Sequence, residues 1–328
     1  MLQSFLTSNN LFRFLIKATR QKPLLIMTIY GYIQHRTSLI HESLDPLSKG
    51  FTLGTQLGII EYAGYNGSLL CSYAYFSGER LENVEIKMNS FLMWMDEYKF
   101  SGNTRKSNAI FTQTVHCLQG RTKSPYILDG TYVALSDLLI QAEGNNLLKC
   151  TLDLCRLELF YLFHRYKDAG SILEGSLDVI KLRPGHFSGV RFTFYECLVS
   201  IQLANTTGNK VWISRANAAR SKIFKWVKSG NVNCLHMVSL IEAETAVMEG
   251  KIDDAATFFN QITIDSKNVL FLNDKALLFE RSGLFFKGIG NDIMAKESFS
   301  KAHQLYSDWG AKAKKDHLLQ LNCNQSKK

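Results

Sequence analysis

The carboxylates most suited to acid–base chemistry lie inside helical patterns. Glu242, Glu244 and Glu280 could exchange protons with a substrate if two of them met beside it. Glu242 and Glu244 are only two positions apart, so they point away from each other on a helix. Solvated helix faces or hydrogen bonds between helices account for all three glutamates, and we expect no catalytic residue.

Histidine, cysteine and serine could supply metal ligands or a nucleophile. The chain has no HExxH motif and no cysteine–histidine zinc spacing, and His35 and His41 do not share a helix face. The GSL triplets at 67–69 and 175–177 lack the GxSxG elbow of hydrolases. We therefore expect no metal site. The eight histidines are His35, His41, His116, His164, His186, His236, His303 and His317.

A phosphate-binding loop of the form GxxxxGK[ST] is also missing. The glycines of KGIGND, residues 287–292, are better explained by a turn between two helices. We expect no nucleotide or other cofactor, and no small-molecule substrate is evident. The sequence argues against an enzyme.

One basic segment, SRANAARSKIFKWVKSG at 214–230, could contact RNA. Phe224 and Trp226 lie among its basic residues and could stack on bases. An amphipathic helix that turns Ile223, Phe224 and Trp226 partly inward, with its lysines outside, is the favoured interpretation. The basic residues are Arg215, Arg220, Lys222, Lys225 and Lys228.

The length and amino-acid composition are typical of a folded chain. Its 328 residues are 46% hydrophobic, and no apolar run approaches the ~18 residues of a membrane span. The net charge of +9 permits a nucleic acid, an anionic membrane face or an acidic protein as partner, and selects none of them. Seven cysteines without a CxxC pair indicate reduced, buried thiols and a cytoplasmic location.

The amino-terminal segment permits two interpretations. Residues 1–41 contain five basic and no acidic side chains, as organelle transit peptides do. Residues 1–22 could thus be a leader that directs import into an organelle. The favoured interpretation is that the first helices of the fold begin here, because the apolar residues continue into the core pattern.

The elements that must position these side chains are helices in a repeating arrangement. Two successive segments carry apolar or small residues at the same spacing of 4, 3, 4 and 3, which places each set on one helix face. Gly290 lies in the turn between them, and Gly310 is a natural helix stop. The first set is Leu272, Ala276, Phe279, Gly283 and Phe286, and the second is Ala295, Phe299, Ala302, Tyr306 and Trp309.

The same helical hairpin recurs upstream. Forty residues earlier, LIEAETAVMEGKIDDAATFFNQI carries the equivalent small and large positions. Ala169 takes the alanine position in a third unit, where His164 replaces the glycine. Small residues where helices cross let two backbones approach, and a bulky substitution at Ala255 or Ala295 would overpack the crossing. The remaining equivalent positions are Gly58, Ala63, Ala243, Gly250 and Phe259.

This pattern is typical of tetratricopeptide-like (TPR-like) repeats with degenerate, lengthened units. We expect an all-α fold, a right-handed superhelical array (α-solenoid) in which each hairpin packs on its neighbours. Residues 23–320 form a single domain with a soft division near 181–189, and 321–328 a disordered basic tail. The clearest repeats are 236–266 and 272–309. Further helices are expected near 80–97, 103–118, 131–143, 145–164, 189–205 and 210–228.

The chain resembles the helical-repeat region that follows the AAA-type (STAND-like) ATPase module in large multi-domain signalling kinases, including hybrid histidine kinases. Residues 33–63, 186–204, 236–259 and 276–314 carry the resemblance, and the WGA-x-AK ending is its most specific part. Ile59 and Ile60 depart from it, because the family tends to be acidic there. The resemblance implies a TPR-like array and no catalytic residue, since the family's activities lie in other modules.

Three functions remain open. The leading hypothesis is a non-catalytic scaffold for protein–protein interaction, a regulatory or sensor region whose partner is an ATPase or kinase module. The second is a helical-repeat protein that binds RNA, although the repeats lack the regular length of one-base-per-repeat binders. The third is an orphaned fragment of a larger ATPase-kinase with no independent role.

Overall fold

The computed structural model describes residues 19–265 and 271–324, which form helices and no strand. The all-α class is thus confirmed. Most helices pair with the next along the chain. The pairs are α2 (Leu44–Gln56) with α3 (Ile60–Phe76), α4 (Leu81–Glu97) with α5 (Asn103–Gln119), α7 (Asn146–Leu162) with α8 (Tyr166–Glu174), α10 (Ser188–Thr207) with α11 (Lys210–Lys228), α12 (Leu235–Met248) with α13 (Ile252–Asp265), and α14 (Leu272–Gly288) with α15 (Asp292–Trp309).

The remaining elements connect or cover these pairs. A helix over 19–28 continues into the π-helix η1, and short 3₁₀ turns follow it. These elements are η1 (Ile29–Ile33), η2 (Gln34–Arg36), η3 (Ile40–Ser43), α6 (Leu135–Ala142), α9 (Val179–Leu182), η4 (Val232–Cys234) and α16 (Lys312–Asn324).

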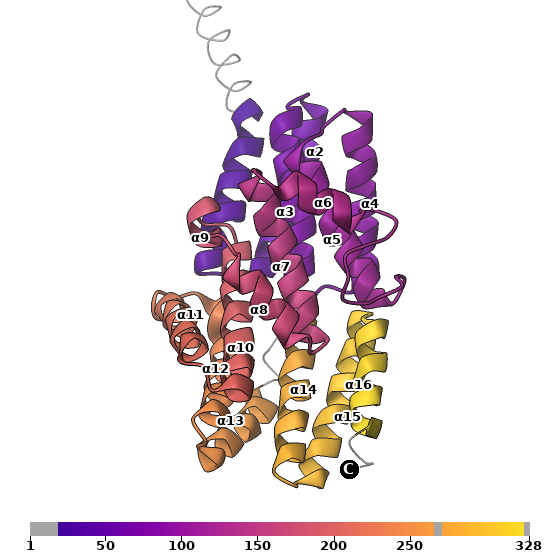
Figure 1. Ribbon diagram of the computed structural model, residues 1–328. Helices are drawn as coiled ribbons and strands as arrows, with labels where there is room; N and C mark the ends of the chain where they lie inside the picture. Colours follow the sequence, from indigo (N-terminus) through magenta and orange to yellow (C-terminus); the bar gives the residue numbers. More distant parts are fainter. Residues whose placement is uncertain (1–18, 266–270, 325–328) are drawn as a thin grey trace, which may run out of the picture.

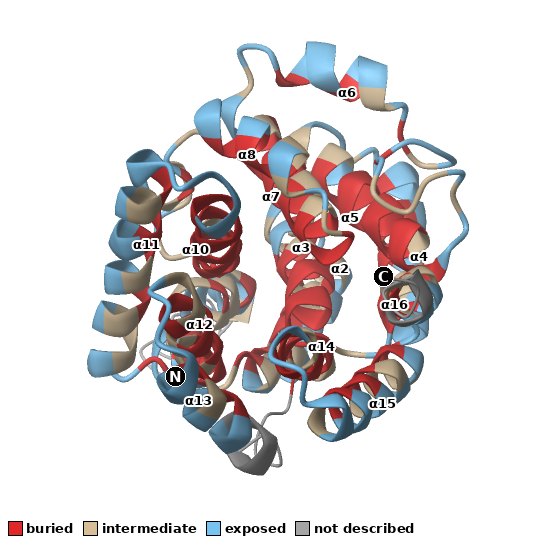
Figure 2. Ribbon diagram, turned by 60° about the horizontal axis from the view of Figure 1, so that its bottom comes forward, coloured by how far each residue is buried: buried red, intermediate tan, exposed pale blue. Residues whose placement is uncertain are grey.

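The helices form an inner and an outer set. The inner helices α3, α5, α7, α10, α12 and α14 lie side by side and are buried along most of their length, whereas α6, α11, α13 and α15 expose one face (Figure 2). Figure 1 shows α2 to α5 at the upper end of the molecule and α10 to α16 at the lower end. Neighbouring helices cover an inner helix on most sides, so its polar side chains must find partners inside the protein.

The turns within the hairpins reverse the chain through left-handed backbone. Gly58, Gly250 and Gly290 have φ angles of 67°, 72° and 79°. His164 occupies the corresponding turn between α7 and α8 with φ 58°, a conformation that a residue with a side chain rarely adopts. The residue that replaces glycine in the sequence pattern therefore adopts a glycine-like backbone.

Contacts extend well beyond neighbouring hairpins, unlike the expectation from the repeat pattern. The last helix α16 packs against α5, and the Tyr75 ring lies 6.4 Å from that of Trp309 between centroids. Arg80 Nε donates to the Asp308 carbonyl oxygen at 3.2 Å. These contacts join the two ends of the helix array.

The buried amide of Asn233 fastens the amino-terminal turns to the middle of the chain. Its Oδ1 accepts from the Ile40 backbone N–H at 2.9 Å, and its Nδ2 donates to the carbonyls of His35 at 2.7 Å and Ser38 at 2.9 Å. One side chain in η4 thereby satisfies three backbone groups nearly 200 residues away.

At the chain ends the structure differs in part from expectation. Residues 1–18 and 325–328 lie outside the described residues, so the leader hypothesis is not addressed. Residues 321–324 belong to α16 rather than to a disordered tail. This helix forms because Ala311, Lys314 and Leu318 make one buried stripe against the core.

The soft division near 181–189 is a turn between helices, because α9 ends at Leu182 and α10 begins at Ser188. Among the described residues, no helix is both long and apolar enough to span a membrane.

Candidate functional site

Two networks of buried charged side chains meet at α14. Arg191 of α10 is fully buried, and its Nη1 lies 2.8 Å and 2.6 Å from the two carboxylate oxygens of Asp274. His236 Nε2 contacts the same carboxylate at 2.8 Å. Tyr195 accepts from Arg191 Nη2 at 3.1 Å and donates to Glu158 at 2.9 Å. We call these five residues the Arg191 cluster.

A second network surrounds Glu280, one of the glutamates considered above. Lys314 Nζ lies 2.7 Å from its Oε1, His164 Nε2 lies 2.8 Å from the same atom, and Tyr306 donates to Oε2 at 2.6 Å. Lys314 also donates to the Leu162 carbonyl oxygen. This Glu280 cluster joins α14, α15 and α16 to the end of α7.

The other two glutamates also form ion pairs. Glu244 accepts from Arg281 Nε at 2.6 Å and from Arg281 Nη2 at 2.9 Å, and it also accepts from Gln202 at 2.7 Å. Glu242 pairs with Arg220 of α11 at 2.7 Å. Glu242 and Glu244 thus form ion pairs with different helices, as their spacing of two positions implies.

The networks hold the carboxylates of Asp274 and Glu280 in their charged form. Burial alone would raise the pKa of Asp274, but Arg191 and the His236 hydrogen bond outweigh it and lower the pKa to about 2. Burial would likewise raise the pKa of Glu280, yet Lys314 and His164 hold it well below its ordinary value. A carboxylate held in its charged form is a poor proton carrier near neutral pH. Both groups fasten helices together.

The residues chosen for the repeat pattern line the helix crossings. The alanines Ala63, Ala169, Ala255 and Ala295 are all buried. A Cβ at Gly283 would meet the Phe299 ring at 2.7 Å, so α14 and α15 approach closely there. Other buried positions are Ala243, Phe259, Phe286, Ala302, Tyr306 and Trp309, and the exposed ones are the turn glycines Gly58, Gly250, Gly290 and Gly310.

The basic segment forms α11, an amphipathic helix. Ile223 is fully buried, while Phe224 and Trp226 are partly buried. Outside lies a shallow depression of about 560 Å³, and Phe224 forms part of its floor with the Arg220 guanidinium 5.2 Å from its ring centroid. The depression is lined by Asn217, Arg220, Ser221, Phe224, Lys225 and Lys228, with no acidic residue among them. We call Arg220, Lys225 and Lys228 the α11 basic face.

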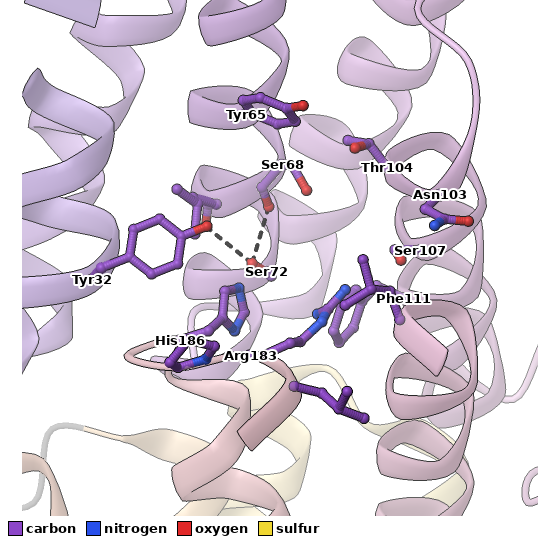
Figure 3. A pocket seen from close by; sticks show the side chains of 14 residues that line it. Tyr32, Tyr65, Ser68, Ser72, Asn103, Thr104, Ser107, Phe111, Arg183 and His186 are labelled. Carbon is purple, nitrogen blue, oxygen red and sulfur yellow. Dashed lines mark hydrogen bonds between the residues drawn. The ribbon is translucent and has the colours of Figure 1, made fainter. Parts of the chain in front are cut away.

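A second hollow, of about 340 Å³, opens between α3, α5 and the turn before α10 (Figure 3). Arg183 reaches into it toward Phe111, and Ser72 and His186 lie beside it. Sequence reasoning missed this Arg183 cavity because its residues come from five separate segments. The local signal in the sequence is KLRPGHFSG, residues 181–189, which by itself predicts a division between helices and no cavity.

Cysteines and histidines do not assemble into a reactive site among the described residues. Six described cysteines are free and buried, and burial raises the pKa of Cys71 to about 12, so its thiol stays protonated. No group of three histidine, cysteine, aspartate or glutamate side chains in the described part of the chain is placed to hold a metal ion.

No protein-family model, curated protein or solved structure matches the chain. The resemblance to the repeat region of signalling ATPases therefore stays a prediction from the sequence.

Proposed function

We propose that the chain is a non-catalytic scaffold that binds a protein partner, built as a right-handed superhelical array of TPR-like hairpins. Two features support this proposal. The helices pair into hairpins with small residues at their crossings, and the interior carboxylates are engaged in ion pairs between helices. By the resemblance in sequence, the partner would be an ATPase or kinase module of a cytoplasmic signalling system.

The α11 basic face is the observation that carries the binding proposal. Lys225 and Lys228 are exposed on one side of α11, and the Arg220 guanidinium lies 5.2 Å from the ring centroid of the half-buried Phe224. Glu242 compensates Arg220, so the lysines provide most of the unbalanced charge. Such a surface attracts an acidic segment and offers its side chains an apolar contact. We therefore infer that the partner presents acidic residues next to an aromatic or aliphatic one.

The test is affinity purification of the tagged chain from native lysate, with nuclease treatment and identification of partners by mass spectrometry. The variant K225E/K228E removes the basic face, and K123E/K296E is its control because it reverses two exposed lysines on other helices or loops. We expect an acidic protein that resists nuclease, is retained by the control and is lost with K225E/K228E.

RNA binding is the competing outcome of the same experiment. Recovery of ribonucleoproteins alone, lost after nuclease treatment, would replace the protein partner by RNA. A partner retained equally by both variants would refute the assignment of the α11 basic face.

A further inference from the structure

Arg183 is a half-buried cation whose charge no acidic side chain balances among the residues that the structure describes. No hydrogen bond or ion pair engages its guanidinium anywhere in the described residues, and no acidic side chain is among those that line its cavity. Burial lowers the pKa of Arg183, which means that the surroundings disfavour its charge. An arginine in such a place is costly unless an anion joins it.

The lining supplies further hydrogen-bonding groups around the guanidinium. The Asn103 side-chain oxygen already accepts from Asn145 at 2.7 Å, which leaves the Asn103 amide N–H groups as donors. Ser72 donates its own hydroxyl hydrogen to the backbone of α3, at 3.0 Å and 3.2 Å. The other hydroxyl-bearing residues on the wall are Tyr32, Tyr65, Ser68, Thr104 and Ser107.

Apolar side chains complete the wall. Leu69 and Phe111 are buried beside the cavity, and Leu182 borders it from the turn. A volume of about 340 Å³ lies at the lower end of the range for small-molecule sites. The cavity therefore combines one cation, several neutral polar groups and an apolar surface.

We propose that the Arg183 cavity binds a carboxylate that carries a small apolar group. A single guanidinium matches a single carboxylate through two parallel hydrogen bonds. A phosphate dianion would leave its second charge without a cation, because Arg183 is the only charged residue among those that line the cavity at neutral pH. The apolar group would pack on Phe111 and Leu69. This site is separate from the α11 basic face and does not depend on it.

The carboxylate could come from a free organic acid or from the carboxy-terminal residue of a peptide. Phenylacetate represents the first source and N-acetyl-alanyl-phenylalanine the second. Phenylacetamide and the peptide amide serve as uncharged controls. Binding is measured by isothermal titration calorimetry to the full chain, and melting temperatures are recorded without ligand.

The variants are R183M, which keeps the apolar stem, R183K, which keeps the charge but not the planar fork, and R20Q as a control at an exposed arginine. We expect at least one carboxylate to bind wild type and R20Q, and its amide to bind about tenfold more weakly or not at all. R183M should lose that difference, and R183K should retain part of it. Which probe binds identifies the source.

Two results would overturn the proposal. In the first, neither carboxylate binds better than its amide. In the second, R183M lowers the melting temperature of the ligand-free protein markedly, since Arg183 would then support the fold. A ligand site predicts the opposite, because removal of an unpaired buried charge leaves the melting temperature unchanged or higher.

Discussion

Two arginines eight positions apart have opposite surroundings. Arg191 on α10 is completely buried, with Asp274 at 2.6 Å and Tyr195 at 3.1 Å. Arg183, in the turn before α10, borders a cavity and has no acidic partner there. Burial acts against both charges, yet Asp274 and its neighbours raise the pKa of Arg191 above its ordinary value, whereas burial lowers the pKa of Arg183.

The difference arises from the helices that cover each side chain. Arg191 faces α14 and α7, which contribute Asp274 and Glu158. Arg183 borders a cavity to which α3 and α5 contribute neutral side chains and no carboxylate. One cation is satisfied within the fold and serves stability, while the other is left for a ligand. The proposed ligand site therefore lies beside Arg183, a positive charge that has no acidic partner in its cavity.

The largest effect should come from R191M. The substitution leaves Asp274 and Glu158 buried without their cation, which costs about 3–5 kcal/mol of unfolding free energy. Urea denaturation of R191M, R183M and wild type measures the contrast directly. R183M should change the free energy by less than about 1 kcal/mol. Equal losses in the two variants would refute the distinction between the two arginines.

The Glu280 cluster should behave like the Arg191 cluster. K314M removes the cation beside the buried Glu280 and leaves only its contacts with His164 and Tyr306, so we expect a loss of about 3 kcal/mol of unfolding free energy. The double variant K314M/E280Q removes both charges and should be more stable than K314M alone, because the stranded carboxylate is gone. A double-mutant cycle from urea denaturation checks this, and strict additivity would show that the pair is not coupled.

Acid should weaken the Arg191 cluster without affecting the Arg183 cavity. The pKa of Asp274 is about 2 in the folded protein and about 3.9 when unfolded, so its contribution is present above pH ~4 and is lost as the pH falls toward 2. The expected loss of unfolding free energy is about 3 kcal/mol, because a pKa difference of one corresponds to about 1.4 kcal/mol. Glu280 should add to this loss of stability at low pH, because the fold lowers its pKa as well.

The pH dependence is measured by denaturation between pH 5 and the acid limit of folding. The variant D274N should show a shallower fall than wild type, and R183M should follow the wild-type slope. An unchanged slope in D274N would mean that Asp274 is not held in its charged form by the fold.

The smallest effect should come from the surface. K225E/K228E replaces two exposed side chains of α11, and we expect its unfolding free energy to stay within about 0.5 kcal/mol of wild type. Comparing its unfolding free energy with that of R191M distinguishes buried charges that hold helices together from exposed charges that are available to a partner. A large loss of stability would show instead that the lysines support α11.

Local features were predictable from the sequence. The 4, 3, 4, 3 spacing from Ala295 to Trp309 predicts α15, and the Gly290 turn and Gly310 end are visible as glycines. The boundaries expected for α4, α5 and α11 lie within one or two residues of those observed. Even His164 was placed at a glycine position, and its φ of 58° fits that placement.

The partners of the charged residues were not predictable. Glu280 is 116 positions from His164 and 34 from Lys314, and no periodicity relates them. The Arg183 cavity likewise depends on η1, α3, α5, α7 and the turn before α10 meeting in space. Basic and acidic residues look alike in sequence whether they are solvated, paired or left uncompensated.

The helices, their turns and the small residues at their crossings can be recognised in the sequence, because helix periodicity and left-handed turns depend on neighbours a few positions away. The packing of α16 against α5, the ion pair of Arg191 with Asp274, and the lack of a carboxylate in the lining of the Arg183 cavity follow from the packing of the helices in space. These outcomes depend on which helices share a boundary, and charge interactions are set by distance in space rather than along the chain.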